Sequence, residues 1–144
     1  MDLTVNVKDI TLNIRVVVLV KTKKGYVLEK SPDGYLYFIG GRIKINETSE
    51  EAAKREIYEE IGIKVDNLIF KAVVENFFIP KENKPVHEIS FVYMTEGELE
   101  IPNLVADRVE YPSSEFEKLD IRPKVLKDYI LTNNNSSHII YKGF

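Results

Sequence analysis

The sequence predicts an α/β fold in which a few helices pack on a mixed β-sheet. Two observations predict it. Strand-like runs of β-branched and aromatic residues recur along most of the chain, and two segments between them have the apolar spacing and end signals of helices. No repeat or long linker divides the chain, so residues 1–144 are expected to form one domain.

The N-terminal third is predicted to consist mainly of strands. Residues 10–14 alternate apolar and polar side chains, as a strand with one buried face does. The β-branched run 15–20 is typical of a strand that is buried on both faces. Residues 26–29 are the expected return strand of a hairpin, and a third strand is expected over residues 35–39, ended by the two glycines that follow.

A helix is predicted over Ser49–Ile61. Thr48 has the features of an N-cap, and Glu51 three residues later completes a capping box. Gly62 stands where a helix commonly ends on a glycine in the left-handed conformation, which makes it a structural residue.

The remainder of the chain is again mainly strand. Residues 67–79 and 87–95 are expected to pair, joined by a proline-flanked loop at residues 80–85. A short helix, a second helix with proline in its first turn, and an edge strand are expected at residues 113–117, 122–131 and 138–141.

The composition excludes several classes of protein. With no Cys and two His, the chain has no disulfide scaffold, thiolate zinc site, iron–sulfur cluster or cysteine nucleophile. A bound metal must therefore be held by oxygen, which favours magnesium, calcium or manganese. The net charge of −3 argues against stable nucleic-acid binding. The longest apolar run, Val16–Val20, is far shorter than a membrane span, so a cytoplasmic protein without a membrane partner is expected.

Three glutamates of the predicted helix share one face. Glu56, Glu59 and Glu60 have the spacing i, i+3, i+4, and like charges at this spacing destabilise a helix by roughly 0.2–0.5 kcal/mol per pair. A divalent cation would remove this repulsion, because hard cations bind carboxylate oxygens. The same spacing is found in solvated acidic helix faces, so the three residues alone leave both interpretations open.

The residues around these glutamates resemble the signature of the Nudix hydrolases. From Gly41 the chain reads Gly, five residues, Glu47, seven residues, and then REIYEEIGI over residues 55–63, which matches every specified position of the Nudix box. Many members have Pro and Gly where this chain has Ile39 and Asn46, but neither position belongs to the required pattern. The resemblance implies the Nudix fold, an α/β/α sandwich with a mixed β-sheet.

The resemblance also implies an activity. Nudix enzymes use Mg²⁺ or Mn²⁺ to hydrolyse a pyrophosphate linkage in a nucleoside diphosphate joined to another group, as in a (d)NTP, ADP-ribose or a nucleotide sugar. Arg55 is implied to orient the glutamates by bridging to Glu47, and Arg55, Glu56 and Glu59 are the implied catalytic residues. The implied metal ligands are three side chains and one backbone carbonyl, those of Glu56, Glu59, Glu60 and Gly40.

Two further assignments are less specific. The general base is either a box glutamate, Glu56 or Glu59, or an acidic residue elsewhere, for which the candidates are Glu88, Asp107 and Glu110. The candidate substrate contacts are Gly41, Arg15, Tyr35 and His87. Each has a structural alternative: Arg15 can lie at a sheet edge, His87 can hydrogen-bond a turn, and Tyr35 and Tyr37 can pack in the core instead of stacking on a base.

The partner expected from the resemblance is a small nucleotide diphosphate substrate, and a homodimer is one of the assemblies that it allows. The alternative function is that of a non-catalytic, nucleotide-sensing Nudix domain that regulates a partner. Such domains often lack box glutamates, whereas this chain has all of them.

Overall fold

The computed structural model describes residues 1–80, 84–105 and 107–143. Its helices are α1 (Ser49–Ile61), a 3₁₀ helix at Ser113–Lys118, and α2 (Lys124–Leu131). The strands, in chain order, are β1 (Thr4–Val7), β2 (Ile10–Leu19), β3 (Lys21–Thr22), β4 (Gly25–Lys30), β5 (Leu36–Arg42), β6 (Leu68–Phe78), β7 (Val86–Thr95), β8 (Arg108–Tyr111), β9 (Ile121–Arg122) and β10 (His138–Lys142).

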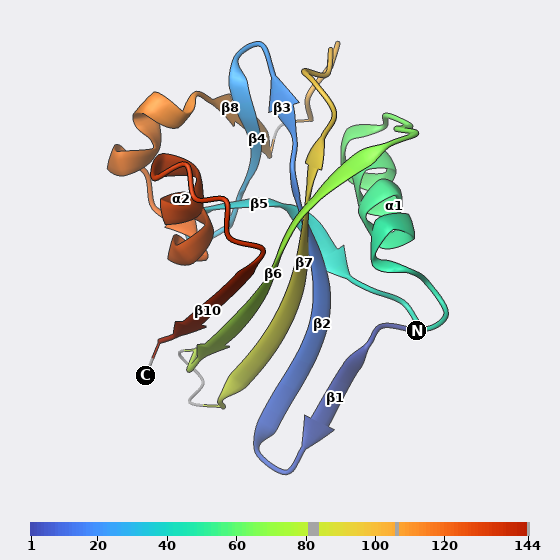
Figure 1. The fold of residues 1–144 in the computed structure, drawn as a ribbon, viewed down its shortest axis with the longest axis vertical. Helices are drawn as coiled ribbons and strands as arrows, with labels where there is room; N and C mark the ends of the chain where they lie inside the picture. The colour runs from blue at the N-terminus through green and yellow to red at the C-terminus, as the bar shows by residue number, and fades with distance from the viewer. Residues whose placement is uncertain (81–83, 106, 144) are drawn as a thin grey trace.

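The strands form a mixed sheet in the order β10-β6-β7-β2-β5-β4-β3, and β1, β8 and β9 pair with β2, β4 and β5. The long central strand β2 is parallel to β7 and antiparallel to β5. Helices α1 and α2 lie on opposite sides of this sheet (Figure 1). The predicted α/β class with a mixed sheet is therefore confirmed.

The predicted helix and its end signals are also confirmed. In the capping box, the Glu51 backbone N–H donates to the Thr48 hydroxyl at 3.1 Å, and the Thr48 N–H donates to the Glu51 carboxylate at 2.8 Å. At the other end, Gly62 has a φ of 81° and its N–H donates to the carbonyl of Tyr58. The sequence thus sets both ends of α1 through local hydrogen bonds.

Two predictions about the strands need correction. The third strand does not end at the two glycines, because β5 continues through Gly40 and Gly41 to Arg42 and pairs both with β2. The pairing brings the backbones so close that a Cβ at Gly40 would lie 2.2 Å from the carbonyl oxygen of Val16. No strand was predicted at residues 4–7, where β1 pairs with β2. Of the expected loop at residues 80–85, residues 81–83 lie outside the described part of the chain.

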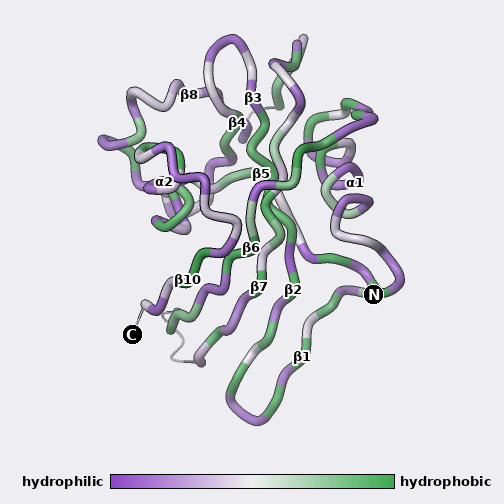
Figure 2. Tube along the Cα trace, in the orientation of Figure 1, coloured by the Kyte–Doolittle hydropathy of each residue, from purple (hydrophilic) through white to green (hydrophobic). Residues whose placement is uncertain are grey.

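The core has two layers, one on each side of β2. Val16, Val18 and Val20 face the layer that contains Ala53 and Ile57 of α1. The alternate residue Leu19 faces the other layer, which contains residues of the 3₁₀ helix and α2. This confirms that the C-terminal part of β2, from Val16 to Leu19, is buried on both faces. Hydrophobic positions concentrate in the strands between the two helices (Figure 2).

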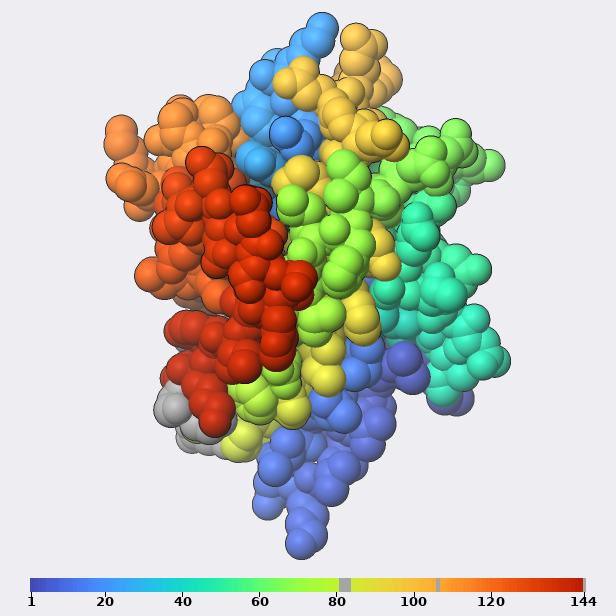
Figure 3. Space-filling view, viewed as in Figure 1, coloured from blue at the N-terminus to red at the C-terminus, as the bar shows by residue number. Residues whose placement is uncertain are grey.

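The docking of α1 fixes the position of the glutamates. Ala52, Ala53 and Ile57 are fully buried against the sheet, and Glu56 beside them is only 8% exposed. In the space-filling view, α1 and α2 occupy opposite flanks, with β6 and β7 visible between them (Figure 3). No helix in the described ranges is both long and apolar enough to cross a membrane.

Candidate active site

Arg55 is the centre of a hydrogen-bond network at the start of the site. Its Nε and Nη2 donate to the two carboxylate oxygens of Glu47, at 2.6 and 2.9 Å, which is the bidentate geometry of a strong ion pair. Its Nη1 donates to Glu56 at 2.9 Å and to Glu59 at 3.3 Å, and Nη2 also reaches the carbonyl of Arg42 at 3.1 Å. The predicted bridge from Arg55 to Glu47 is confirmed, and the loop before α1 is thereby tied to the helix.

The ion pair between Arg55 and Glu47 stabilises the charged forms of both residues. The hydrogen bond from Arg55 is the main cause that holds the pKa of Glu47 below its usual value, against the opposing effect of burial. Hydrogen bonding to Glu47 in turn raises the pKa of Arg55, which stays charged at all working pH values.

The lowered pKa of Glu47 predicts acid-sensitive stability. Because the folded pKa lies below the unfolded value of 4.5, the contribution is complete above that value and is lost as pH falls through the folded pKa. A charge-assisted hydrogen bond of this kind contributes about 1.5–3 kcal/mol. In urea unfolding at a series of pH values, the deficit of Glu47→Gln relative to the unsubstituted chain should be constant near neutrality and shrink below pH 4.5. Glu50→Gln, at an exposed pair on the same helix, is the control, and an equal deficit at every pH would contradict the prediction.

Gly41 leaves room for the carboxylate of Glu56. A Cβ at Gly41 would lie 2.2 Å from Oε1 of Glu56 and 2.5 Å from its Cδ, closer than any real contact. Glu56 is buried and held by Arg55, so its carboxylate is packed directly against the Gly41 backbone. The sequence predicted Gly41 as a substrate contact, and the structure places it beside a predicted metal ligand.

Glu60 lies one turn further along α1 in a charged but largely buried setting. Burial, followed by the negative charge of Glu29, raises its pKa, and the negative charge of the neighbouring Glu56 acts in the same direction. Arg108 opposes this shift, with its Nη2 at 3.7 Å from Oε2 of Glu60. That oxygen is buried and has no hydrogen-bond partner among the described residues.

The chemistry of these carboxylates suits a divalent cation, but their side chains do not converge on one point. Glu56 and Glu60 are neighbours, and the unpaired Oε2 of Glu60 is the kind of hard oxygen donor that Mg²⁺ and Mn²⁺ prefer. Within the described ranges, however, no three acidic or histidine side chains converge as a ready metal site. Glu59 is turned toward Arg55, which donates to it at 3.3 Å, and its side chain is 50% exposed.

Arg15 and Glu88 lie on the other side of the sheet from this cluster, and Glu110 has a hydrogen-bond partner of its own. Arg15 alternates with Val16 along β2 and so lies on the α2 side of the sheet, 3.9 Å from Glu88. Glu110 accepts a hydrogen bond from the hydroxyl of Thr22, and the side chain of Asp107 is exposed.

The two predicted aromatic contacts are also separate from the glutamates. His87 stacks on Phe77 with ring centroids 4.1 Å apart. Along β7, His87 lies four residues from Phe91, which pairs with Val16, and Val16 in turn pairs with Gly41. Four residues of a strand span about 13 Å, so His87 lies about that far from the level of Gly41. Tyr35 precedes β5, and the guanidinium of Arg122 lies 4.1 Å from its ring centroid.

Three residues near Glu60 were not assigned to the site from sequence. Arg108 and Glu29 carry charge, and Tyr37 was considered only as a residue for stacking or packing. Burial, then the adjacent Glu29 as hydrogen-bond partner and negative charge, raises the pKa of Tyr37 to about 12. The sequence gives one weak indication that Arg108 belongs to the site. It stands between Asp107 and Glu110, which were both candidates for the general base.

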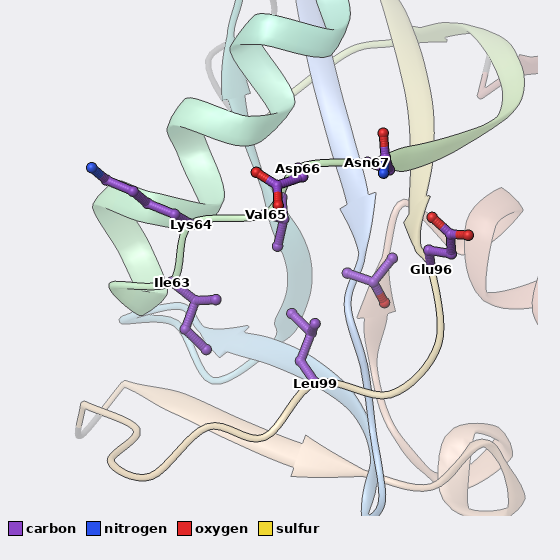
Figure 4. Close-up of a pocket in the computed structure, with 8 residues that line it drawn as sticks. Ile63, Lys64, Val65, Asp66, Asn67, Glu96 and Leu99 are labelled. Atoms are coloured by element: carbon purple, nitrogen blue, oxygen red, sulfur yellow. The ribbon is translucent and has the colours of Figure 1, made fainter.

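A hollow near the end of α1 is distinct from this cluster. It has a volume of about 220 Å³, below the roughly 300–1,000 Å³ of most ligand pockets. Ile63 and Leu99 line it, and Lys64 extends away from Leu99 (Figure 4). The acidic residues that line the hollow, Asp66 and Glu96, are not part of the Arg55 network, so the site is assigned to the glutamates of α1.

Comparisons with known proteins identify the family of the chain. A family model described as the NUDIX domain matches residues 7–129. The mutator MutT protein from Bacillus halodurans has a similar structure, with a TM-score of 0.65 at 19% identity over 91% of each chain. A MutT NUDIX hydrolase from Burkholderia pseudomallei gives 0.53 at 26% identity, covering 67% of this chain and 77% of that one. A NUDIX hydrolase from Nitrosomonas europaea gives 0.60 at 15% identity, covering 88% and 91%. The chain therefore belongs to the Nudix family of pyrophosphohydrolases.

Proposed function

We propose that the chain uses Mg²⁺ or Mn²⁺ to hydrolyse a pyrophosphate linkage in a small nucleotide substrate, a nucleoside diphosphate joined to another group, by attack of water on phosphorus. The observation that carries this proposal is the Arg55 network, which fixes Glu47, Glu56 and Glu59 around one guanidinium. Glu56 and Glu59 of this network, with Glu60 adjacent, would supply the oxygen ligands that the chemistry requires, while Glu47 holds Arg55 in place.

Some of these residues would bind the cation, and others keep the binding residues in position. Glu56 and Glu60, with Glu59 after a rotamer change and the carbonyl of Gly40, would hold the cation. When bound, the cation supplies charge neutralisation for the phosphate oxygens, which otherwise repel an attacking water. Arg55 holds Glu56 in place by a hydrogen bond, and the half-exposed carboxylate of Glu59 is accessible to accept a proton from water.

A substrate screen tests this function. Phosphate release is measured with Mg²⁺ or Mn²⁺ across (d)NTPs, ADP-ribose, nucleotide sugars and dinucleoside polyphosphates, with and without a chelator. We expect chelator-sensitive hydrolysis of at least one class. Nucleotide binding without turnover of any class would favour the sensing domain instead.

Gly41→Ala tests the close packing of Gly41 and Glu56. The new methyl group must displace the Glu56 carboxylate from Arg55, so we expect metal affinity or turnover to fall by about 10–100-fold, as when an orienting partner is lost. Overpacking should cost about 1–3 kcal/mol of stability. Gly34→Ala is the control. The φ of 92° at Gly34 strains an alanine, but a Cβ at this position would meet no atom within 4 Å. This variant should therefore lose stability but not turnover. Normal metal affinity and turnover in Gly41→Ala would contradict the assigned packing.

A further inference from the structure

A row of polar side chains crosses three strands beside the end of α1. Arg108 on β8 pairs in register with Glu29 on β4, and Glu29 pairs in register with Tyr37 on β5. Nη1 of Arg108 lies 3.5 Å from Oε1 of Glu29, and its Nη2 lies 3.7 Å from Oε2 of Glu60. The guanidinium is therefore placed between one acidic residue of the sheet and one of the helix.

The row is largely shielded from solvent. The side chains of Arg108, Glu29 and Glu60 are 13%, 18% and 17% exposed. Charges in such a setting are costly to bury unless they are paired, and an exposed ion pair would contribute little. The burial therefore makes the position of Arg108 relevant to the orientation of Glu60.

Arg108 differs from Arg55 in how it contacts its carboxylates. Arg55 donates hydrogen bonds at 2.6–3.3 Å, whereas Arg108 stays at ion-pair distances from both partners. Among the described residues, neither its buried Nε nor Oε2 of Glu60 has a hydrogen-bond partner. Glu60 is thus held by an ion pair, while Oε2 makes no hydrogen bond that would compete with a cation.

We propose that Arg108 is a positioning residue which, anchored by Glu29, holds the carboxylate of Glu60 beside Glu56 for the divalent cation. The inference rests on the proposed function, since it assigns a role toward the same metal site. Without Arg108, Glu29 and Glu60 would be two buried carboxylates that repel each other, and Glu60 would turn away from Glu56. Orienting partners of metal ligands commonly act in this way.

If Arg108 acted only through its charge, its removal would change the metal affinity in the opposite direction. The positive charge of Arg108 by itself repels a cation, so its removal would tighten metal binding if orientation were unimportant. Replacing Arg108 with lysine keeps the charge and removes the planar fork, so a charge effect predicts unchanged affinity. The sign and the lysine variant together separate positioning from charge.

The experiment measures Mn²⁺ affinity of the full chain by titration calorimetry, without substrate, alongside the melting temperature without metal. We expect Arg108→Gln and Glu29→Gln each to weaken Mn²⁺ binding by about 10-fold, and Arg108→Lys to fall between Arg108→Gln and the unsubstituted chain. The double variant should be little weaker than the worse single variant, since both act through one contact. Lys124→Gln, which breaks an exposed pair on α2, is the control.

The possible results are distinct. Unchanged or tighter Mn²⁺ binding in Arg108→Gln, or unchanged binding in Arg108→Lys, would overturn the inference and leave the proposed function intact. Failure of the unsubstituted chain to bind Mn²⁺ would overturn both. If Arg108→Gln does not fold, Arg108→Lys and Glu29→Gln decide, and normal affinity in both rejects the positioning role.

Discussion

Replacing Glu59 with glutamine is expected to lower metal-dependent turnover by about 10²–10³-fold, since loss of a charged ligand removes several kcal/mol of transition-state stabilisation. The fold should be unaffected. Glu59 is 50% exposed, and its contact with the described residues is one hydrogen bond from Arg55 at 3.3 Å, which glutamine can also accept. The effect should therefore be confined to catalysis.

The measurement is initial rate against metal concentration for the best substrate of the screen, with thermal melting as the check on folding. Glu60→Gln is expected to behave similarly, because a neutral side chain suits its buried position. Glu50→Gln, on the same helix and paired with Lys54, should keep full turnover. Undiminished hydrolysis by Glu59→Gln would remove that residue from the ligand set.

Replacing Arg55 with alanine is expected to reduce both stability and turnover. The substitution leaves Glu47 and Glu56, whose side chains are 15% and 10% exposed, without their cationic partner. Breaking a buried ion pair on one side costs about 3–5 kcal/mol, and the loop before α1 loses its link to the helix. Turnover should fall by at least about 10²-fold, because Glu56 is no longer oriented.

Urea unfolding and steady-state kinetics measure the two effects separately. Arg55→Lys keeps the charge but cannot donate to Glu47 in a bidentate manner while also reaching Glu56. It should therefore recover part of the stability and little of the turnover. Full turnover in either variant would show that the network does not orient the catalytic carboxylates.

Local signals in the sequence accounted for α1 and for the alternation of β2. The capping box at Thr48 and the glycine at position 62 act through neighbouring residues, so their outcome does not depend on the rest of the fold. Strand β5 was predicted too short, because a glycine pair usually ends a strand. Here the partner strand β2 requires glycine for close approach, and that requirement is visible only after the strands are paired.

In the site, too, some contacts could be predicted from the sequence and others only after the strands are paired. The bridge from Arg55 to Glu47 is implied by the resemblance to the Nudix family, and it is present. The grouping of Glu29, Arg108 and Tyr37 is not encoded by spacing, because it depends on the register of three strands that are distant in sequence. The alternation along β2 likewise decides that Arg15 and Glu88 lie on the face opposite α1.

The sequence by itself determined the family, the ends of α1 and the face that carries Glu56, Glu59 and Glu60, because helix periodicity and caps are local. Only the tertiary structure decided which strands lie beside that face. It places Gly41 against Glu56 and Arg108 between Glu29 and Glu60, since strand register and helix docking arise from burying the apolar surface of the whole chain.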